Sequence, residues 1–148
     1  ERLAMGLVLI LKRASELGVR VAFEPEPGMF VERPEGYGRL VEYMGSDGED
    51  LGLCLDVGHL VVTGDLPVEK EIERWASRLI HVHLDDAVAG THEHLMFGEG
   101  ELDLSATLKA LVETEYGGLA AVELSRDSHR GPAAAAEALD RLREALRP

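Results

Sequence analysis

The chain has 148 residues, which is enough for one domain with a buried core. Its 28 acidic residues outnumber its 15 Lys and Arg residues, and the formal net charge is −13. Because contacts to phosphate backbones need clustered Lys and Arg, this charge argues against a nucleic acid partner. The single cysteine, Cys54, excludes an internal disulfide and favours a reducing, cytoplasmic location. No apolar run is long enough to cross a bilayer and no signal peptide pattern is present, so no membrane partner is expected.

Short apolar strands alternate with helices along the chain. Residues 1–17 have apolar positions at helical spacing and end at Gly18, so they predict an opening helix. The expected strands cover residues 19–24, 51–56, 79–84 and 119–124. The expected later helices cover residues 36–44, 67–77, 104–115 and 132–146, with a short helical segment after residue 59 and a long loop over residues 85–102. Strands separated by helices predict an α/β fold with a parallel sheet and right-handed crossovers.

The alternation of side chains along the expected strands indicates which α/β fold it is. Small and polar residues share one face, as in the pairs Cys54 and Asp56 or Ala121 and Glu123. Bulky residues are expected on the opposite face, under the helices: Val21, Phe23, Leu53, Leu55, Ile80, Val82 and Val122. A doubly wound sheet would need bulky apolar residues on both faces, so the pattern favours a barrel.

Each expected strand ends in a residue of a type that binds metal ions. These residues are Glu24, Asp56, His83 and Glu123. Because parallel strands end at the same edge of a sheet, the four side chains are expected to meet there. Three carboxylates crowded together repel one another unless a cation lies between them. The set therefore predicts a site for a divalent ion, with Mn²⁺, Mg²⁺, Co²⁺ and Zn²⁺ all suited to it.

Other polar residues are expected near the same end of the sheet. His59 follows Asp56 by three residues, so it is a candidate for hydrogen bonding a substrate hydroxyl, for binding a second ion, or for a packing role. His92 and His94 lie in the expected long loop and are candidates for reaching over the metal. Glu26 follows Glu24 in a loop and is a candidate pocket residue. His81 shares the face of His83 one layer deeper and is expected to be a buried, hydrogen-bonded core residue.

Five segments, taken in order, resemble the xylose isomerase-like TIM-barrel superfamily. They are Phe23-Glu24-Pro25, Leu55-Asp56-Val57-Gly58-His59, His81-Val82-His83-Leu84-Asp85-Asp86, the loop from Glu93 and His94 to Gly98-Glu99-Gly100, and Val122-Glu123. This superfamily includes sugar and sugar phosphate isomerases and epimerases, and the apurinic endonucleases. The resemblance implies that Glu24, Asp56, His83 and Glu123 bind the metal, and it places His59 in the site.

The resemblance also predicts how much of the fold is present. It begins at the helix before strand five of a (β/α)8 TIM barrel, so residues 1–148 are expected to be the C-terminal part of one such domain, with about the last four strand–helix units. A complete barrel needs about 250 residues. We therefore expect either a truncated sequence or a partner, such as a second copy, that supplies the missing half.

Within the superfamily, the isomerases and epimerases fit the chain best. The resemblance implies a metal-dependent enzyme acting on a small sugar, keto-sugar or sugar phosphate through an enediolate, with Glu24 and Glu123 as acid and base. A dehydratase of keto-inositols would use much the same site. The first alternative is an apurinic endonuclease-like zinc phosphodiesterase, although that branch has Asp where this chain has His92. The second is a non-catalytic metal-binding partner of the same fold.

Overall fold

The computed structural model describes residues 1–147. In chain order the longer elements are α1 (Arg2–Leu17), β1 (Val21–Phe23), α2 (Pro34–Met44), β2 (Leu51–Asp56), α3 (Val57–Thr63), α4 (Val68–Trp75), β3 (Leu79–Leu84), β4 (Asp86–Val88), β5 (Thr91–Leu95), α5 (Leu104–Glu113), β6 (Leu119–Val122) and α6 (Gly131–Ala145). Two 3₁₀ helices, η1 (Gly45–Gly48) and η2 (Ser125–Arg130), complete the described elements. The predicted order of strands and helices is therefore confirmed outside residues 85–102, with ends that differ by a few residues.

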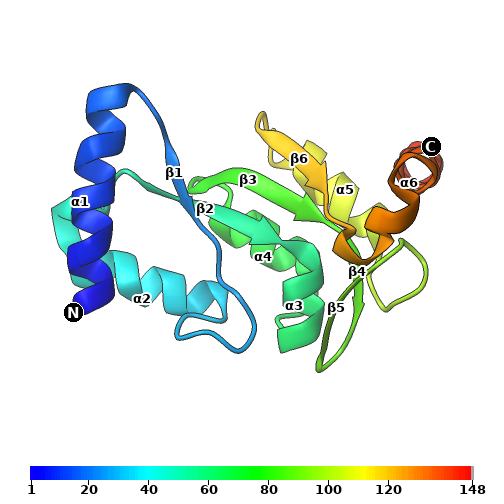
Figure 1. Cartoon of the computed structure of the whole chain (residues 1–148), viewed down its shortest axis with the longest axis horizontal. Coiled ribbons are helices and arrows are strands. Elements are labelled where there is room, and N and C mark those ends of the chain that lie inside the picture. Colours follow the sequence, from blue (N-terminus) through cyan, green and yellow to red (C-terminus); the bar gives the residue numbers. More distant parts are fainter. Residues whose placement is uncertain (148) are drawn as a thin grey trace.

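The main sheet has four strands in the order β1-β2-β3-β6, and all neighbouring strands are parallel. In Figure 1 the sheet lies in the middle of the molecule, α4 and α5 lie behind it, and α1 and α2 lie beside β1. The sequential order of the strands with helical crossovers is that of one continuous part of a barrel wall. All four strands point their carboxyl ends in the same direction, so the residues that follow them share one edge.

The helix-facing side of the sheet forms the core. Leu53, Leu55 and Val82 have exposed fractions of 1% or less. Tyr37, on α2, is also fully buried, and its hydroxyl donates a hydrogen bond to the carbonyl of Leu51 at 2.6 Å. Because successive side chains of a strand alternate, burial of one set of side chains under the helices turns the other set to the opposite face of the sheet.

One irregularity in β3 changes the predicted alternation. Leu53 pairs with Leu79 but the next residue, Cys54, pairs with His81, so Ile80 is an extra residue in the ladder. The side chain of Ile80 lies directly against Gly52, where a Cβ would overlap it. The prediction that Ile80 shares the bulky face with Val82 is therefore wrong, because the bulge turns Ile80 to the face of Gly52.

The segment between β3 and α5 contains a hairpin, so the prediction of one long loop over residues 85–102 is also wrong. Strands β4 and β5 pair antiparallel. After the hairpin, the chain is held by Asp86, which is 1% exposed. Its carboxylate accepts hydrogen bonds from the backbone N–H groups of Gly98, Gly100 and Leu102 at 2.7–3.0 Å, and from that of Ala87 at 2.9 Å. One buried carboxylate thereby fixes the segment that leads from the hairpin to α5.

We expect Asp86→Asn to lower the free energy of unfolding by about 2–4 kcal/mol, because the amide NH2 cannot accept the N–H groups that one carboxylate oxygen now accepts. Denaturant unfolding measures the loss, and hydrogen exchange should show it first in residues 96–102. Asp140→Asn, at an exposed ion pair with Arg143, is the matched control and should change stability by less than about 0.5 kcal/mol. Equal stability of the two variants would contradict the role given to Asp86.

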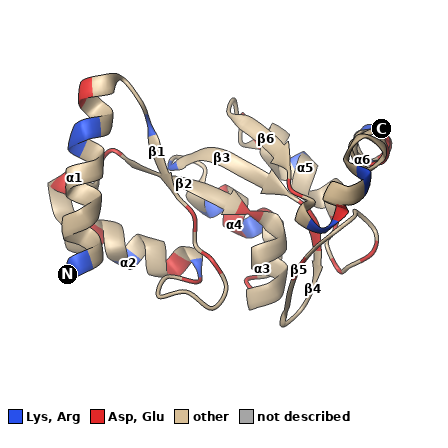
Figure 2. Ribbon diagram, viewed as in Figure 1, with Lys and Arg blue, Asp and Glu red and all other residues tan. Residues whose placement is uncertain are grey.

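Figure 2 shows acidic residues where the chain leaves the strands of the main sheet. The strands themselves carry few charges between their ends. Among residues 1–147, none of the helices combines the length and the apolar character needed to traverse a bilayer.

Candidate metal centre

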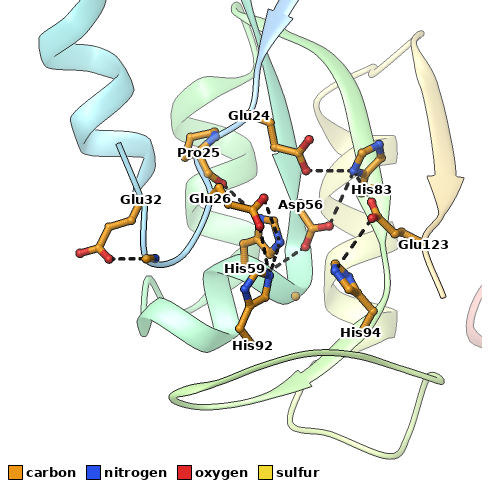
Figure 3. Close-up of polar contacts among 12 residues, drawn as sticks. Glu24, Pro25, Glu26, Glu32, Asp56, His59, His83, His92, His94 and Glu123 are labelled. Atoms are coloured by element: carbon orange, nitrogen blue, oxygen red, sulfur yellow. Dashed lines mark hydrogen bonds and ion pairs between the residues drawn. The ribbon is translucent and has the colours of Figure 1, made fainter. Parts of the chain in front are cut away.

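The four residues predicted to bind a metal lie together at the carboxyl end of the sheet. Asp56 is the last residue of β2 and pairs in register with His83 of β3. Glu24 is the first residue after β1, and Glu123 is the first residue after β6. One ligand atom from each residue lies within 4.8 Å of the others. Figure 3 shows Glu24, His83 and Glu123 arranged around Asp56.

His83 lies between the carboxylates. Its Nδ1 atom is 2.7 Å from Glu123 Oε2, 3.0 Å from Glu24 Oε1 and 3.7 Å from Asp56 Oδ2. The hydrogen bond with Glu24 and the surrounding negative charges raise the pKa of His83 to about 9, although burial opposes them. A protonated imidazole here supplies positive charge to a group of three carboxylates, which is also what a bound cation would supply.

The carboxylate of Asp56 has one satisfied and one unsatisfied oxygen. Oδ1 accepts a hydrogen bond from the backbone N–H of His59 at 2.8 Å and so caps α3. Oδ2 is buried and has no hydrogen-bond partner among the described residues. Burial, and next the charge of Asp85, raise the pKa of Asp56 to about 7. A buried, unpaired carboxylate oxygen beside three further donors fits a divalent cation.

The pKa of Glu24 is shifted in the opposite direction to that of Asp56. Burial raises the pKa of Glu24. The hydrogen bond and charge of His83, with the charges of His59 and His81, lower it by more than burial raises it, so the net pKa lies below the ordinary value. Glu24 is therefore ionised at neutral pH and available as a ligand or as a base.

Asp85 is a site residue that the sequence reasoning missed. It is 1% exposed, and its Oδ1 accepts the backbone N–H of Gly58 at 3.0 Å, while Oδ2 lies 2.8 Å from His94 Nδ1. Burial raises its pKa to about 7. A Cβ on Gly58 would overlap the carboxylate of Asp85, so Gly58 has to be glycine for this contact. The signal was available, because Asp85 follows His83 by two residues and so continues its side of the strand.

A second group of side chains contains His59, His92, His94 and Glu26. His59 Nδ1 lies 3.1 Å from the carbonyl of Pro25, which can only accept, so Nδ1 carries the hydrogen. His59 Nε2 is 3.0 Å from His92 Nε2, and we assign the hydrogen of that contact to His92. Glu26 lies 3.5 Å from His92 and 3.8 Å from His59. The structure therefore brings the predicted loop residues to the predicted site (Figure 3).

The burial of His81, one layer below His83 in the sheet, differs from the prediction. His81 is only partly buried, and its ring centroid lies 4.9 Å from that of His83 on the same face of β3. Cys54, which pairs in register with His81, is 5% exposed, and burial raises the pKa of its thiol. The expectation that His81 is a buried core histidine is wrong, because this face of the four-stranded sheet is not covered as the helix-facing side is.

Parallel strands joined by helices, with a cluster of polar side chains at their carboxyl ends, are typical of TIM barrels, and the comparison with known families gives the same fold. The family described as "Xylose isomerase-like TIM barrel" matches residues 1–145. The chain belongs to this family, and its four parallel strands with their helices are part of such a barrel.

The relatives with curated descriptions include inosose dehydratases and a rhizopine catabolism protein. Rhizopine catabolism protein MocC of Rhizobium meliloti is 32% identical over 138 residues, covering 82% of this chain and 41% of the relative. Inosose dehydratase of Lacticaseibacillus casei is 29% identical over 144 residues, covering 86% of this chain and 47% of the relative. The chain thus spans about half the length of the curated relatives it matches.

Two solved structures superpose well on this chain. A D-tagatose 3-epimerase-like protein superposes with a TM-score of 0.75 at 25% identity, covering 97% of this chain and 55% of that one. The IolI protein, solved with a binding zinc atom, superposes with a TM-score of 0.70 at 25% identity, covering 96% and 52%. The barrel part of the resemblance predicted from sequence is therefore confirmed.

Proposed function

We propose that this chain carries the metal site of an isomerase or epimerase that acts on a small sugar, keto-sugar or sugar phosphate. The observation that supports this proposal most is the buried, unpaired Oδ2 of Asp56, surrounded by donors from Glu24, His83 and Glu123. Relatives and structural neighbours that are named as sugar or inosose enzymes agree with a polyol substrate.

The proposed chemistry is the transfer of a proton next to a carbonyl group. When bound, the cation supplies positive charge that polarises the substrate carbonyl. Glu24 and Glu123 reach His83 Nδ1 from the ends of two different strands, β1 and β6. In the proposed reaction one carboxylate removes a proton from the carbon beside the carbonyl and the other returns it, to a neighbouring carbon or to the opposite face. The partly exposed carboxyl groups of Glu24 and Glu123 are accessible to such a substrate, whereas Asp56 is buried and only holds charge.

The second candidate is a zinc phosphodiesterase like the apurinic endonucleases. The observation that favours it is the cluster of His59, His92 and His94, whose ring nitrogens lie within 4.8 Å of one another and could hold a further ion. The net charge of −13 argues against a DNA substrate. A non-catalytic metal-binding role is the third candidate.

Metal content distinguishes the first candidate from the second. We expect elemental analysis of the purified full-length protein to find about one Mn, Mg, Co or Zn per chain, removable with a chelator and absent from a Glu24→Gln, Asp56→Asn double variant. About three zinc ions per chain would favour the phosphodiesterase. A protein that holds no metal and takes none up would contradict the proposed chemistry while leaving the barrel in place.

We further propose that other strands complete the barrel around this site. The sheet has two unpaired edges, β1 and β6, and Leu119 and Val122 of β6 are 66% and 38% exposed. Either the rest of a longer chain or a second copy would cover these edges and add substrate contacts. The mass of the denatured chain, compared with the native mass in solution, distinguishes the two arrangements, because only a second copy makes the native mass a multiple of the chain mass.

A further inference from the structure

The proposed transfer of a proton between Glu24 and Glu123 does not involve Asp85 or His94. Asp85 is almost fully buried, yet its two oxygens are fully used, one by the backbone N–H of Gly58 and the other by His94 Nδ1 at 2.8 Å. His94 is in turn partly exposed toward the site, with a side chain that is 16% accessible. A buried carboxylate that orients a histidine at the edge of a site is the arrangement used to hold an imidazole for proton transfer.

The hydrogen bond to Asp85 determines which nitrogen of His94 faces the site. With Nδ1 turned to Asp85, Nε2 is the free nitrogen, and it lies 3.9 Å from Glu123 Oε1. The position of Asp85 is itself fixed, because Gly58 leaves room for the carboxylate and donates a hydrogen bond to it. The segment that follows the hairpin is held separately, by hydrogen bonds from the backbone N–H groups of Gly98 and Gly100 to Asp86.

We propose that His94 is a third proton-transfer group, positioned by Asp85, and that it allows this site to eliminate water from a keto-polyol. The proposal rests on the proposed function, since it uses the same metal site and the same removal of a proton beside the carbonyl. It adds the acid that isomerisation and epimerisation do not need.

The proton balance of the elimination is closed within the site. Glu123 takes the proton from the carbon beside the carbonyl, the electron pair forms a carbon–carbon double bond, and the bond from the next carbon to its hydroxyl breaks. Hydroxide is a poor leaving group at neutral pH. In this step His94 starts as an imidazolium with a hydrogen on each nitrogen, gives the Nε2 proton to the hydroxyl, which leaves as water, and becomes a neutral imidazole. Glu123 then returns its proton to His94, which restores both groups. The products are an unsaturated ketone and one water molecule, and no oxidant or reductant is needed.

Two assays on the full-length protein with added Mn²⁺ separate the two chemical steps. The probes are a keto-inositol and a ketohexose in D2O. NMR follows exchange of the proton beside the carbonyl, which reports on the metal site and the carboxylates, and ultraviolet absorbance follows the unsaturated ketone. We expect His94→Gln to lower water loss about 100-fold while proton exchange stays within about threefold. His129→Gln, at an exposed histidine on η2, is the matched control and should change neither rate.

Asp85 is tested as a positioning residue. Asp85→Asn should lower kcat for water loss about 10-fold or more with little change in KM, and adding it to His94→Gln should cost nothing more. Added imidazole should partly restore water loss to His94→Gly, which a merely structural role would not allow. If either Asp85 variant fails to fold, the His94 variants and the imidazole rescue decide the matter alone.

Other outcomes overturn the proposal. Equal losses of exchange and water loss in His94→Gln would make His94 part of the common site, and unchanged rates would remove it from the chemistry. Proton exchange without water loss in the unaltered protein would overturn this proposal and leave the proposed function standing. Absence of exchange with either probe would count against both.

Discussion

Replacing Glu123 by glutamine is expected to lower turnover about 10³-fold, with the fold retained. The amide keeps an oxygen for the cation but cannot take a proton, so the variant loses the base and not the shape of the site. Glu123 Oε2 lies 2.7 Å from His83 Nδ1, and the carboxylate is about one third exposed, so the substitution leaves no large buried cavity. The measurement is kcat for the interconversion of a keto-sugar, made beside metal content and circular dichroism.

Glu113→Gln is the control for this substitution, since Glu113 is exposed on α5 and pairs only with Lys109 at 3.7 Å. It makes the same chemical change in the same chain and should leave kcat unaltered. A Glu123→Gln variant that retains its metal and turns over within about 10-fold of the unaltered protein would show that Glu123 is not the base.

The convergence of the four strand-end side chains was predictable because it depends on two general rules. Strands joined by helices run parallel, and their carboxyl ends meet, so Glu24, Asp56, His83 and Glu123 had to converge if the strands were assigned correctly. Alternation then placed them on one face. Both rules use only the order and the spacing of residues, which the sequence contains.

The errors come from features that depend on partners far away in the sequence. The bulge at Ile80 is a property of the pairing with β2, and no local pattern in residues 79–84 reveals it. The β5 segment Thr91–Leu95 is mostly polar, so it lacks the apolar alternation that predicts a strand. Asp85 was missed for another reason, because an acidic pair after a strand is more often a helix cap or a turn than a buried site residue.

Asp56→Asn is expected to have two effects of opposite sign. The variant should lose most of its metal affinity, because Asn replaces a buried anionic ligand with a neutral one. Without metal it should be more stable than the unaltered protein at pH 8, by up to about 4 kcal/mol, since burial raises the pKa of Asp56 to about 7 and a tenfold change in proton affinity corresponds to about 1.4 kcal/mol. Asn retains the oxygen that accepts the N–H of His59 and caps α3.

The dependence on pH follows from the direction of the shift. Burial raises the pKa of Asp56 in the folded protein above its ordinary value, so the contribution of Asp56 to stability is fully present below about pH 4 and is lost as the pH rises through 7. The advantage of Asp56→Asn in the metal-free protein should therefore be absent near pH 4 and largest at pH 8. Asp85, with a pKa also raised to about 7, shares this window and remains in both proteins.

Thermal unfolding between pH 5 and pH 8, with chelator and with Mn²⁺, measures both effects. Asp103→Asn is the control, since Asp103 caps α5 by accepting the N–H of Ala106 at 2.9 Å but is exposed and outside the site. It should shift the melting temperature little at any pH and leave the response to Mn²⁺ intact. If metal-free Asp56→Asn is less stable than the unaltered protein at pH 8, the burial of Asp56 Oδ2 without a hydrogen bond does not destabilise the folded protein. The strongest argument for a cation at this position would then be lost.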